Sequence, residues 1–428
     1  MADDDLARRL GTADAVVIGV GSMIGAGVFA AFAPAAAAAG AGLLVGLVIA
    51  AVIAYCNATA TAQLAAQYPT SGGVYVYGRE RLGEWPGFLA GWSFVIGKTA
   101  SCAAMALTFA AYAVPSDWQR PAAAAAVTVL AAVNYRGITR TARLTRMIVA
   151  VVLVALAVAV LAAWSGPGSS EGVGLSDVLG DARADWYGVL QAAGMLFFAF
   201  AGYARIATLG EEVRDPARTI PRAVALALGL VVIVYAIVAV TVLATLDGDG
   251  VAETPVPLVA AVDAGSWDWA GPVVRVGAAA AALGALLALV AGVGRTTLAM
   301  ARRHDLPRWL AAVHPRHRVP HHAEVALAAV VVVAVLTVDL REAIGFSSFG
   351  VLLYYLVANA AALTQERADR RYPRALQVLG ATGCVVLVAT LPPVSVLTGL
   401  AVLALGIVYR LTTRRAPATR DGNAGMLE

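Results

Sequence analysis

Two glycine-interrupted stretches inside long apolar segments are the parts of this sequence best suited to bind a polar solute. The first reads GVGSMIGAGVF over 19–29, and the second reads FFAFAGYAR over 197–205. A lipid bilayer tolerates unwound backbone only where that backbone lines a cavity or is buried in protein. Unwound backbone offers carbonyl groups as acceptors, and the start of a half-helix directs a positive dipole end at an anion. Two interrupted spans at matching places are typical of the binding site of a secondary transporter.

A single lysine, Lys98, lies deep in the third apolar segment. It is roughly 18–24 Å from either end of that segment at the rise of an α-helix, too far for its side chain to reach water. An intramembrane charge is costly, so it indicates a function. Burial disfavours the charged form of an amine, which suits proton transfer near neutral pH. Lys98 is therefore a proton carrier, a fixed cation bonded to carbonyls of a broken helix, or incidental.

The elements that position these residues are apolar helices in a membrane. The chain is 60% hydrophobic and 14% charged, with a mean hydropathy of +0.77, whereas soluble domains average about 25% charged residues. A helix needs roughly 20 apolar residues to cross the bilayer core. Twelve segments meet this need: 13–38, 41–66, 86–114, 119–135, 146–164, 187–210, 221–246, 270–301, 323–338, 342–364, 375–392 and 393–411.

The basic residues predict the orientation of these spans. With the N-terminus inside, 24 of the 31 basic residues lie on the inner side, 3 on the outer side and 4 within spans. Positive charge is retained on the cytoplasmic side of membrane proteins. We therefore expect a multi-pass protein of the inner (plasma) membrane with both termini in the cytoplasm. The same asymmetry accounts for the net charge of +4 without a nucleic-acid partner.

The order of the spans predicts two inverted halves. Five spans precede the loop at 165–186, five follow it, and an odd number per half makes the second half enter from the opposite side. The expected divisions are a cytoplasmic segment at 1–12, a first repeat at 13–164, an extracellular loop at 165–186, a second repeat at 187–364, two further helices at 375–411 and a cytoplasmic tail at 412–428.

Several motifs together resemble the amino acid–polyamine–organocation permeases. Within that group they are most similar to the bacterial cationic-amino-acid-transporter-like permeases. They are GSMIGAGVF at 21–29, YPTSGG at 68–73, NYRG at 134–137, the stretch 197–222, GRTTLAMAR at 294–302 and LPRWLAAVHP at 306–315. The resemblance implies an all-α membrane protein with the leucine-transporter fold, a 5+5 inverted repeat plus two helices. It also implies amino acid transport by proton symport or by exchange, with no cofactor.

The resemblance further implies which residues bind the substrate. Backbone amides of the first break meet the substrate's carboxylate, and carbonyls of both breaks meet its ammonium, while aromatic side chains of the second break cover it. The residues so placed are Met23, Ile24, Gly25, Ala26, Gly27, Phe200, Ala201, Gly202 and Tyr203. Packing of small residues at a helix interface is the alternative interpretation of the glycines.

This chain departs from the resembled family at two charged positions. Ala204 stands where many relatives carry a glutamate, and Val152 stands where many proton-coupled relatives carry a lysine. The core spans hold no Asp or Glu at mid-membrane depth, and Lys98 repels a second cation. A buried charge without a partner costs several kcal/mol. We therefore expect neutral amino acids, with sodium-independent, proton-coupled transport centred on Lys98. A cationic amino acid or polyamine permease and an obligate exchanger are the alternatives.

Other charged groups carry simpler interpretations. Arg205 and Arg295 are expected to pair with Glu211 or Glu212. The five histidines share one basic, turn-rich inner loop, which does not favour a metal site. An intramembrane enzyme needs His, Asp, Ser or Cys groups at depth, and the spans hold no histidine, so the sequence does not favour an enzyme. A channel does not require two matched breaks.

Overall fold

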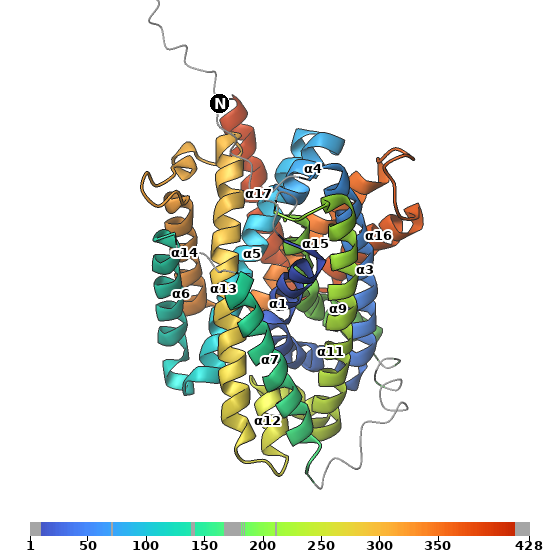
Figure 1. The fold of residues 1–428 in the computed structure, drawn as a ribbon, viewed down its shortest axis with the longest axis vertical. Coiled ribbons are helices and arrows are strands. Elements are labelled where there is room, and N and C mark those ends of the chain that lie inside the picture. The colour runs from blue at the N-terminus through green and yellow to red at the C-terminus, as the bar shows by residue number, and fades with distance from the viewer. Residues whose placement is uncertain are drawn as a thin grey trace, which may run out of the picture.

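The computed structural model describes residues 10–69, 72–137, 142–166, 181, 183, 185–209 and 212–415. This part of the chain is a bundle of helices without a β-sheet, in which one isolated bridge joins Leu10 to Val213 (Figure 1). The helices of the first half are α1 (Thr12–Ala30), α2 (Phe32–Ala39), α3 (Leu43–Gln67), α4 (Gly73–Leu82), α5 (Glu84–Ala113), α6 (Gln119–Tyr135) and α7 (Ala142–Ala163). Those that follow are α9 (Trp186–Phe200), α10 (Ala204–Ala207), α11 (Pro216–Glu253), α12 (Pro257–Asp263), α13 (Ala270–Arg302), α14 (His321–Thr337), α15 (Leu340–Leu363), α16 (Arg374–Thr390) and α17 (Pro393–Arg415).

The helices confirm the predicted class of an all-helical membrane protein. Among the described residues, nine helical stretches are long and apolar enough to cross a bilayer, and His321–Thr337 and Arg374–Thr390 are apolar but shorter. Their ends lie near the predicted ones, except that two predicted spans are divided: 13–38 into α1 and α2, and 187–210 into α9, a short 3₁₀ turn and α10. The count of twelve spans and the inverted repeat stay predictions. The expected loop at 165–186 and the two terminal segments fall largely outside the described residues.

Side-chain caps begin several of the helices. Asp185 accepts a hydrogen bond from the amide of Gly188 at 2.8 Å at the start of α9. Asp339 caps α15 in the same way through the amide of Glu342, whose carboxylate accepts from the Asp339 amide at 3.3 Å. These caps satisfy N–H groups that a helix leaves free at its first turn. They favour helix starts at Trp186 and Leu340.

Helix α1 lies in the middle of the bundle and contacts α5, α7, α9, α11 and α13 (Figure 1). Its Met23, Val28 and Phe29 are buried, as is most of its length. A helix that is apolar all round belongs in the interior of a large bundle. The first glycine-interrupted stretch therefore occupies the centre of the protein.

A close contact between α5 and α15 fixes the position of Lys98. A Cβ atom on Gly97 would lie 3.1 Å from the Cα of Gly350, so the two backbones touch. One turn further on, the hydroxyl groups of Ser101 and Ser347 lie 2.7 Å apart. Small residues let membrane helices approach closely, and buried hydroxyl pairs hold them together. This seam locks the rotation of α5, and with it the direction of the Lys98 side chain.

Candidate functional site

The first break lies at Gly25, inside α1. Its φ of −10° and ψ of −124° depart from helical values, and the chain bends again at Ala31 before α2 begins. The hydroxyl of Tyr235, on α11, lies 2.6 Å from the Met23 carbonyl oxygen and 3.0 Å from that of Ala199. The one hydroxyl proton of Tyr235 can therefore be donated to a carbonyl beside either interruption. Tyr235 is not among the predicted site residues, because a single tyrosine in an apolar span carries no functional signal in the sequence.

The second break follows α9. A 3₁₀ turn, η4 (Ala201–Tyr203), separates α9 from the short helix α10. A Cβ atom on Gly202 would lie 2.2 Å from the Ser22 carbonyl oxygen, and one on Gly27 would lie 2.6 Å from the Cα of Ala199. Real Cβ atoms do not approach backbone so closely, and only glycine gives the required space. The two predicted breaks are thus in direct contact with each other.

A cavity of about 690 Å³ begins at this contact. Four of the predicted site residues line it, from both breaks: Met23, Gly27, Ala201 and Gly202. The cavity extends to the end of the bundle that carries Leu10, Gly72 and Tyr75. Ligand sites are concave, mostly apolar and furnished with a few polar groups, and this cavity has that character.

The remaining predicted residues lie beside the cavity. Ile24 and Gly25 line a separate void of about 10 Å³, together with Val152 of α7. Phe200 packs against Tyr235 with ring centroids 5.1 Å apart, and Tyr203 stacks on Tyr355 at 5.0 Å. Both aromatic rings of the second break are fully buried in these contacts. Ala26 lies in α1 between Gly25 and Gly27.

Lys98 lines the same cavity and is only 6% exposed. Its Nζ atom donates to the carbonyl of Ala201 in the second break at 3.3 Å. The hydroxyl of Tyr355 approaches the same oxygen at 3.4 Å. The structure thus brings the intramembrane lysine to the broken helix, a contact that a proton carrier and a fixed cation would both make.

Aromatic side chains pack on the opposite side of the breaks. Phe29 meets Tyr112 edge-on with ring centroids 5.6 Å apart, and Phe32 meets Tyr235 at 6.5 Å. The hydroxyl of Tyr112 also donates to the Phe29 carbonyl at 3.1 Å. Edge-on aromatic pairs add stability beyond the area that they bury. None of these four aromatic residues is among the described residues that line the cavity.

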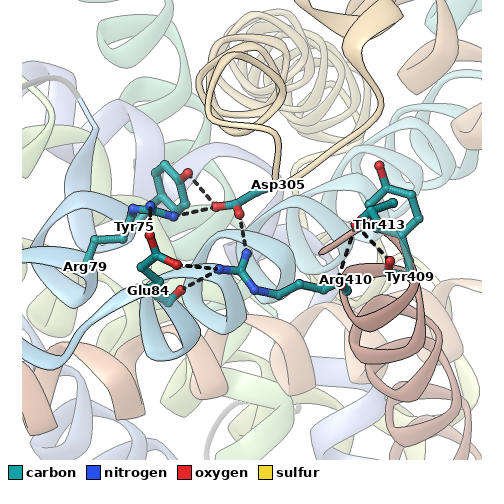
Figure 2. Close-up of polar contacts among 7 residues, drawn as sticks. All are labelled: Tyr75, Arg79, Glu84, Asp305, Tyr409, Arg410 and Thr413. Atoms are coloured by element: carbon teal, nitrogen blue, oxygen red, sulfur yellow. Dashed lines mark hydrogen bonds and ion pairs between the residues drawn. The ribbon is translucent and has the colours of Figure 1, made fainter. Parts of the chain in front are cut away.

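A buried ion network lies near the other end of the cavity (Figure 2). Asp305, which follows α13, accepts from the Tyr75 hydroxyl at 2.7 Å and from Arg79 at 2.8 Å, and it pairs with Arg410 of α17. Glu84 joins the network through Arg79 at 3.4 Å and Arg410 at 3.8 Å. Burial and the neighbouring carboxylate raise the pKa of Tyr75, so its hydroxyl stays protonated and donates. The network ties α4, α5, α13 and α17 together, and the sequence analysis did not foresee it.

Three of the five histidines, His314, His317 and His321, pack around Tyr135. The rings of His314 and His317 lie 4.7 Å apart and those of His314 and His321 5.4 Å apart, while the Nδ1 atom of His314 accepts from two backbone amides. Within the described ranges, no three His, Cys, Asp or Glu side chains are arranged to hold a metal ion.

Comparisons with known proteins identify the family of this chain. The profile of the family described as "Amino acid permease" matches residues 14–423. The chain is 59% identical over 424 residues to the uncharacterized transporter Rv1999c of Mycobacterium tuberculosis, which covers 98% of this chain and 95% of that protein. It is 25% identical over 447 residues to the branched-chain amino acid permease BcaP of Bacillus subtilis, over 96% of this chain and 94% of the permease. It is 27% identical over 387 residues to the chloroplastic cationic amino acid transporter 7 of Arabidopsis thaliana, over 84% of this chain and 66% of the plant protein. The chain is therefore a multi-pass membrane transporter, not an enzyme, and it belongs to the amino acid permease family of the amino acid–polyamine–organocation superfamily.

Proposed function

We propose that this protein is a secondary active transporter that carries neutral amino acids across the inner membrane by alternating access around its two broken helices. The observation that carries the proposal is a cavity at the contact between the two breaks. Gly27 lines it from the first broken helix and Gly202 from the second. An amino acid needs groups for a carboxylate and for an ammonium at mid-membrane. Backbone amides and carbonyls of broken helices supply both without a formal charge.

The proposed site uses both breaks. Amides of Gly25, Ala26 and Gly27 bind the carboxylate, and nearby carbonyls bind the ammonium. The Met23 and Ala201 carbonyls accept bonds from Tyr235 and Lys98 in this structure. The Ala201 carbonyl already accepts from both Lys98 and Tyr355, so a substrate ammonium at this oxygen replaces one of these two donors. We infer that displacement of Lys98 links substrate binding to proton transfer.

Sodium independence is supported by the void beside Gly25. The side chains around it are apolar: Ile24, Ile148, Val149, Val152 and Ala281. A hard cation such as Na⁺ needs several oxygen ligands, because it gives up its hydration shell on binding. Val152 lines this void, at the position where proton-coupled relatives carry a lysine, and it offers no side-chain oxygen.

The preference for neutral substrates is supported by the charges that line the cavity. Lys98, Arg205 and Arg295 line it along with one carboxylate, Glu212. A cationic side chain entering such a cavity meets repulsion that the low dielectric strengthens. The named relatives represent both possibilities. The branched-chain permease corresponds to the proposed neutral substrates, and the cationic amino acid transporter corresponds to the alternative.

Counterflow in proteoliposomes tests the proposal. Vesicles preloaded with alanine, leucine or valine should accumulate the labelled form of the same amino acid, equally well when choline replaces sodium. Unlabelled arginine or lysine should compete less well than these neutral amino acids. Competition by arginine or lysine at lower concentration than alanine, leucine or valine would refute the neutral preference, and no counterflow with any amino acid would refute the function.

The proposed orientation places the network around Asp305, and the end of the cavity that carries Leu10, Gly72 and Tyr75, on the cytoplasmic side. It rests on the distribution of basic residues, 24 inside and 3 outside. A reporter fused after Glu428 should be active only on the cytoplasmic side. Activity of that reporter on the outer side would reverse the orientation.

A further inference from the structure

Two arginine side chains line the cavity near its cytoplasmic end. Arg205 belongs to α10, directly after the second break, and Arg295 belongs to α13. Both line the cavity, as do the nearby polar side chains of Thr208 and Thr296. Both guanidinium groups are cationic and line one cavity, so they repel each other. A guanidinium does not lose its proton in a protein, so neither group can relieve this repulsion by titration.

The carboxylates around this pair do not form ion pairs with it. Among the described residues, no ion pair within 4.0 Å joins Arg205 or Arg295 to a carboxylate. Glu212 lines the cavity and attracts Arg205, and Glu324, buried on α14, attracts Arg295 from behind the cavity wall. The expected pairing with Glu212 is thus a longer-range attraction, and Glu211 lies outside the described residues.

Lys98 adds a third cation to the same cavity and is nearly completely buried. Within the described part of the chain its ammonium group donates one hydrogen bond, to the Ala201 carbonyl, and so has two further N–H donors. The cavity wall therefore carries three cations and one carboxylate over the described residues. Such a wall raises the local concentration of anions and favours their entry.

We propose that Arg205 and Arg295 form a carboxylate-binding subsite at the cytoplasmic mouth of the cavity. It holds the substrate's own carboxylate as the substrate passes between the breaks and the cytoplasm. The planar fork of an arginine matches a carboxylate with two parallel hydrogen bonds. The inference rests on the proposed function and adds to it a second, transient site.

Uptake into membrane vesicles of opposite orientation tests the subsite. Inside-out vesicles present the cytoplasmic mouth to the medium, and right-side-out vesicles present the other face. The variants are Arg205→Gln and Arg295→Gln, and the matched control is Arg275→Gln. Arg275 lies on α13 as well, but it donates to the Tyr112 carbonyl at 3.3 Å and does not line the cavity.

Both variants should raise the KM for valine about tenfold in inside-out vesicles, because hydrogen bonds to charged groups are the strong ones. The KM in right-side-out vesicles should stay unchanged, and Arg275→Gln should change neither value. Arg295→Lys should give an intermediate KM, because it keeps the charge and loses the fork. An unchanged KM in inside-out vesicles for both glutamine variants would overturn the subsite while leaving the proposed function intact.

A second measurement needs no variant. Replacing gluconate by chloride outside wild-type inside-out vesicles should raise the KM for valine, because chloride competes with the substrate's carboxylate for the pair. Stimulation by chloride would instead identify a site for a free inorganic anion and overturn the proposal. If the wild-type protein transports no amino acid at all, both the proposed function and the subsite are refuted.

Discussion

The carboxylate of Asp305 should be among the most costly single groups to neutralise in this protein. It is 2% exposed and is shared by Tyr75, Arg79 and Arg410 (Figure 2). Asp305→Asn keeps the shape and removes the charge. Arg410, which is 1% exposed, then keeps Glu84 at 3.8 Å as its one ionic partner among the described residues.

The expected cost follows from these burial values. Breaking a buried ion pair from one side costs about 3–5 kcal/mol, because the other charge stays buried without its partner. The Arg79 side chain is 15% exposed and keeps Glu84 at 3.4 Å, so part of its charge is still satisfied. We therefore expect a loss near the lower limit, about 3 kcal/mol.

Reversible unfolding of the purified protein in mixed detergent micelles measures this loss. Asp369→Asn is the matched control, since Asp369 is exposed and accepts one bond from Gln67 at 2.7 Å; its cost should be below about 1 kcal/mol. Adding Arg410→Met to Asp305→Asn should restore part of the stability, because an apolar side chain then packs against Trp85 and Phe88. Equal stability of the Asp305 and Asp369 variants would refute the reasoning.

Three further variants test the broken-helix site. Gly27→Ala should abolish valine uptake, because its Cβ would lie 2.6 Å from the Ala199 backbone; normal uptake by this variant, measured at equal membrane abundance, would exclude the close contact. Lys98→Met should flatten the pH dependence of uptake between pH 5 and about 8 if Lys98 exchanges the proton; an unchanged rate and pH profile would make the lysine incidental. Tyr235→Phe should cost about 1–3 kcal/mol in unfolding and slow counterflow, because the carbonyls of Met23 and Ala199 lose their shared donor; wild-type stability and rate would contradict that role.

The sequence alone determined the helices and the places where two of them break. Apolar length sets where a chain can cross a membrane, and this requirement is local to each segment. Glycine within such a segment weakens the helix at that position, whatever the rest of the chain does. The breaks at Gly25 and Gly202 could be located for this reason. The burial of Lys98 followed from its distance to either end of its span. All of these features depend on neighbours in sequence, so they could be predicted.

Only the tertiary structure decided which side of each broken helix faces the cavity. Gly27 lines it, whereas Gly25, two residues earlier, faces a separate void beside Val152. Helix α1 is apolar on all sides, so its hydrophobic pattern carries no sign of its rotation about its own axis. That rotation is set by packing against α9, α11 and α13. The local pattern therefore could not separate these two glycines.

Partners that are distant in sequence were likewise decided by the fold. Asp305 meets Arg410, and Tyr235 reaches Met23, across separations of 105 and 212 residues. Any of several loop arginines has the charge to pair with Asp305, and any carbonyl near a break can accept from a tyrosine. The choice among them follows from which helix ends the packed bundle brings together, and that arrangement of many weak contacts is not written in any one segment.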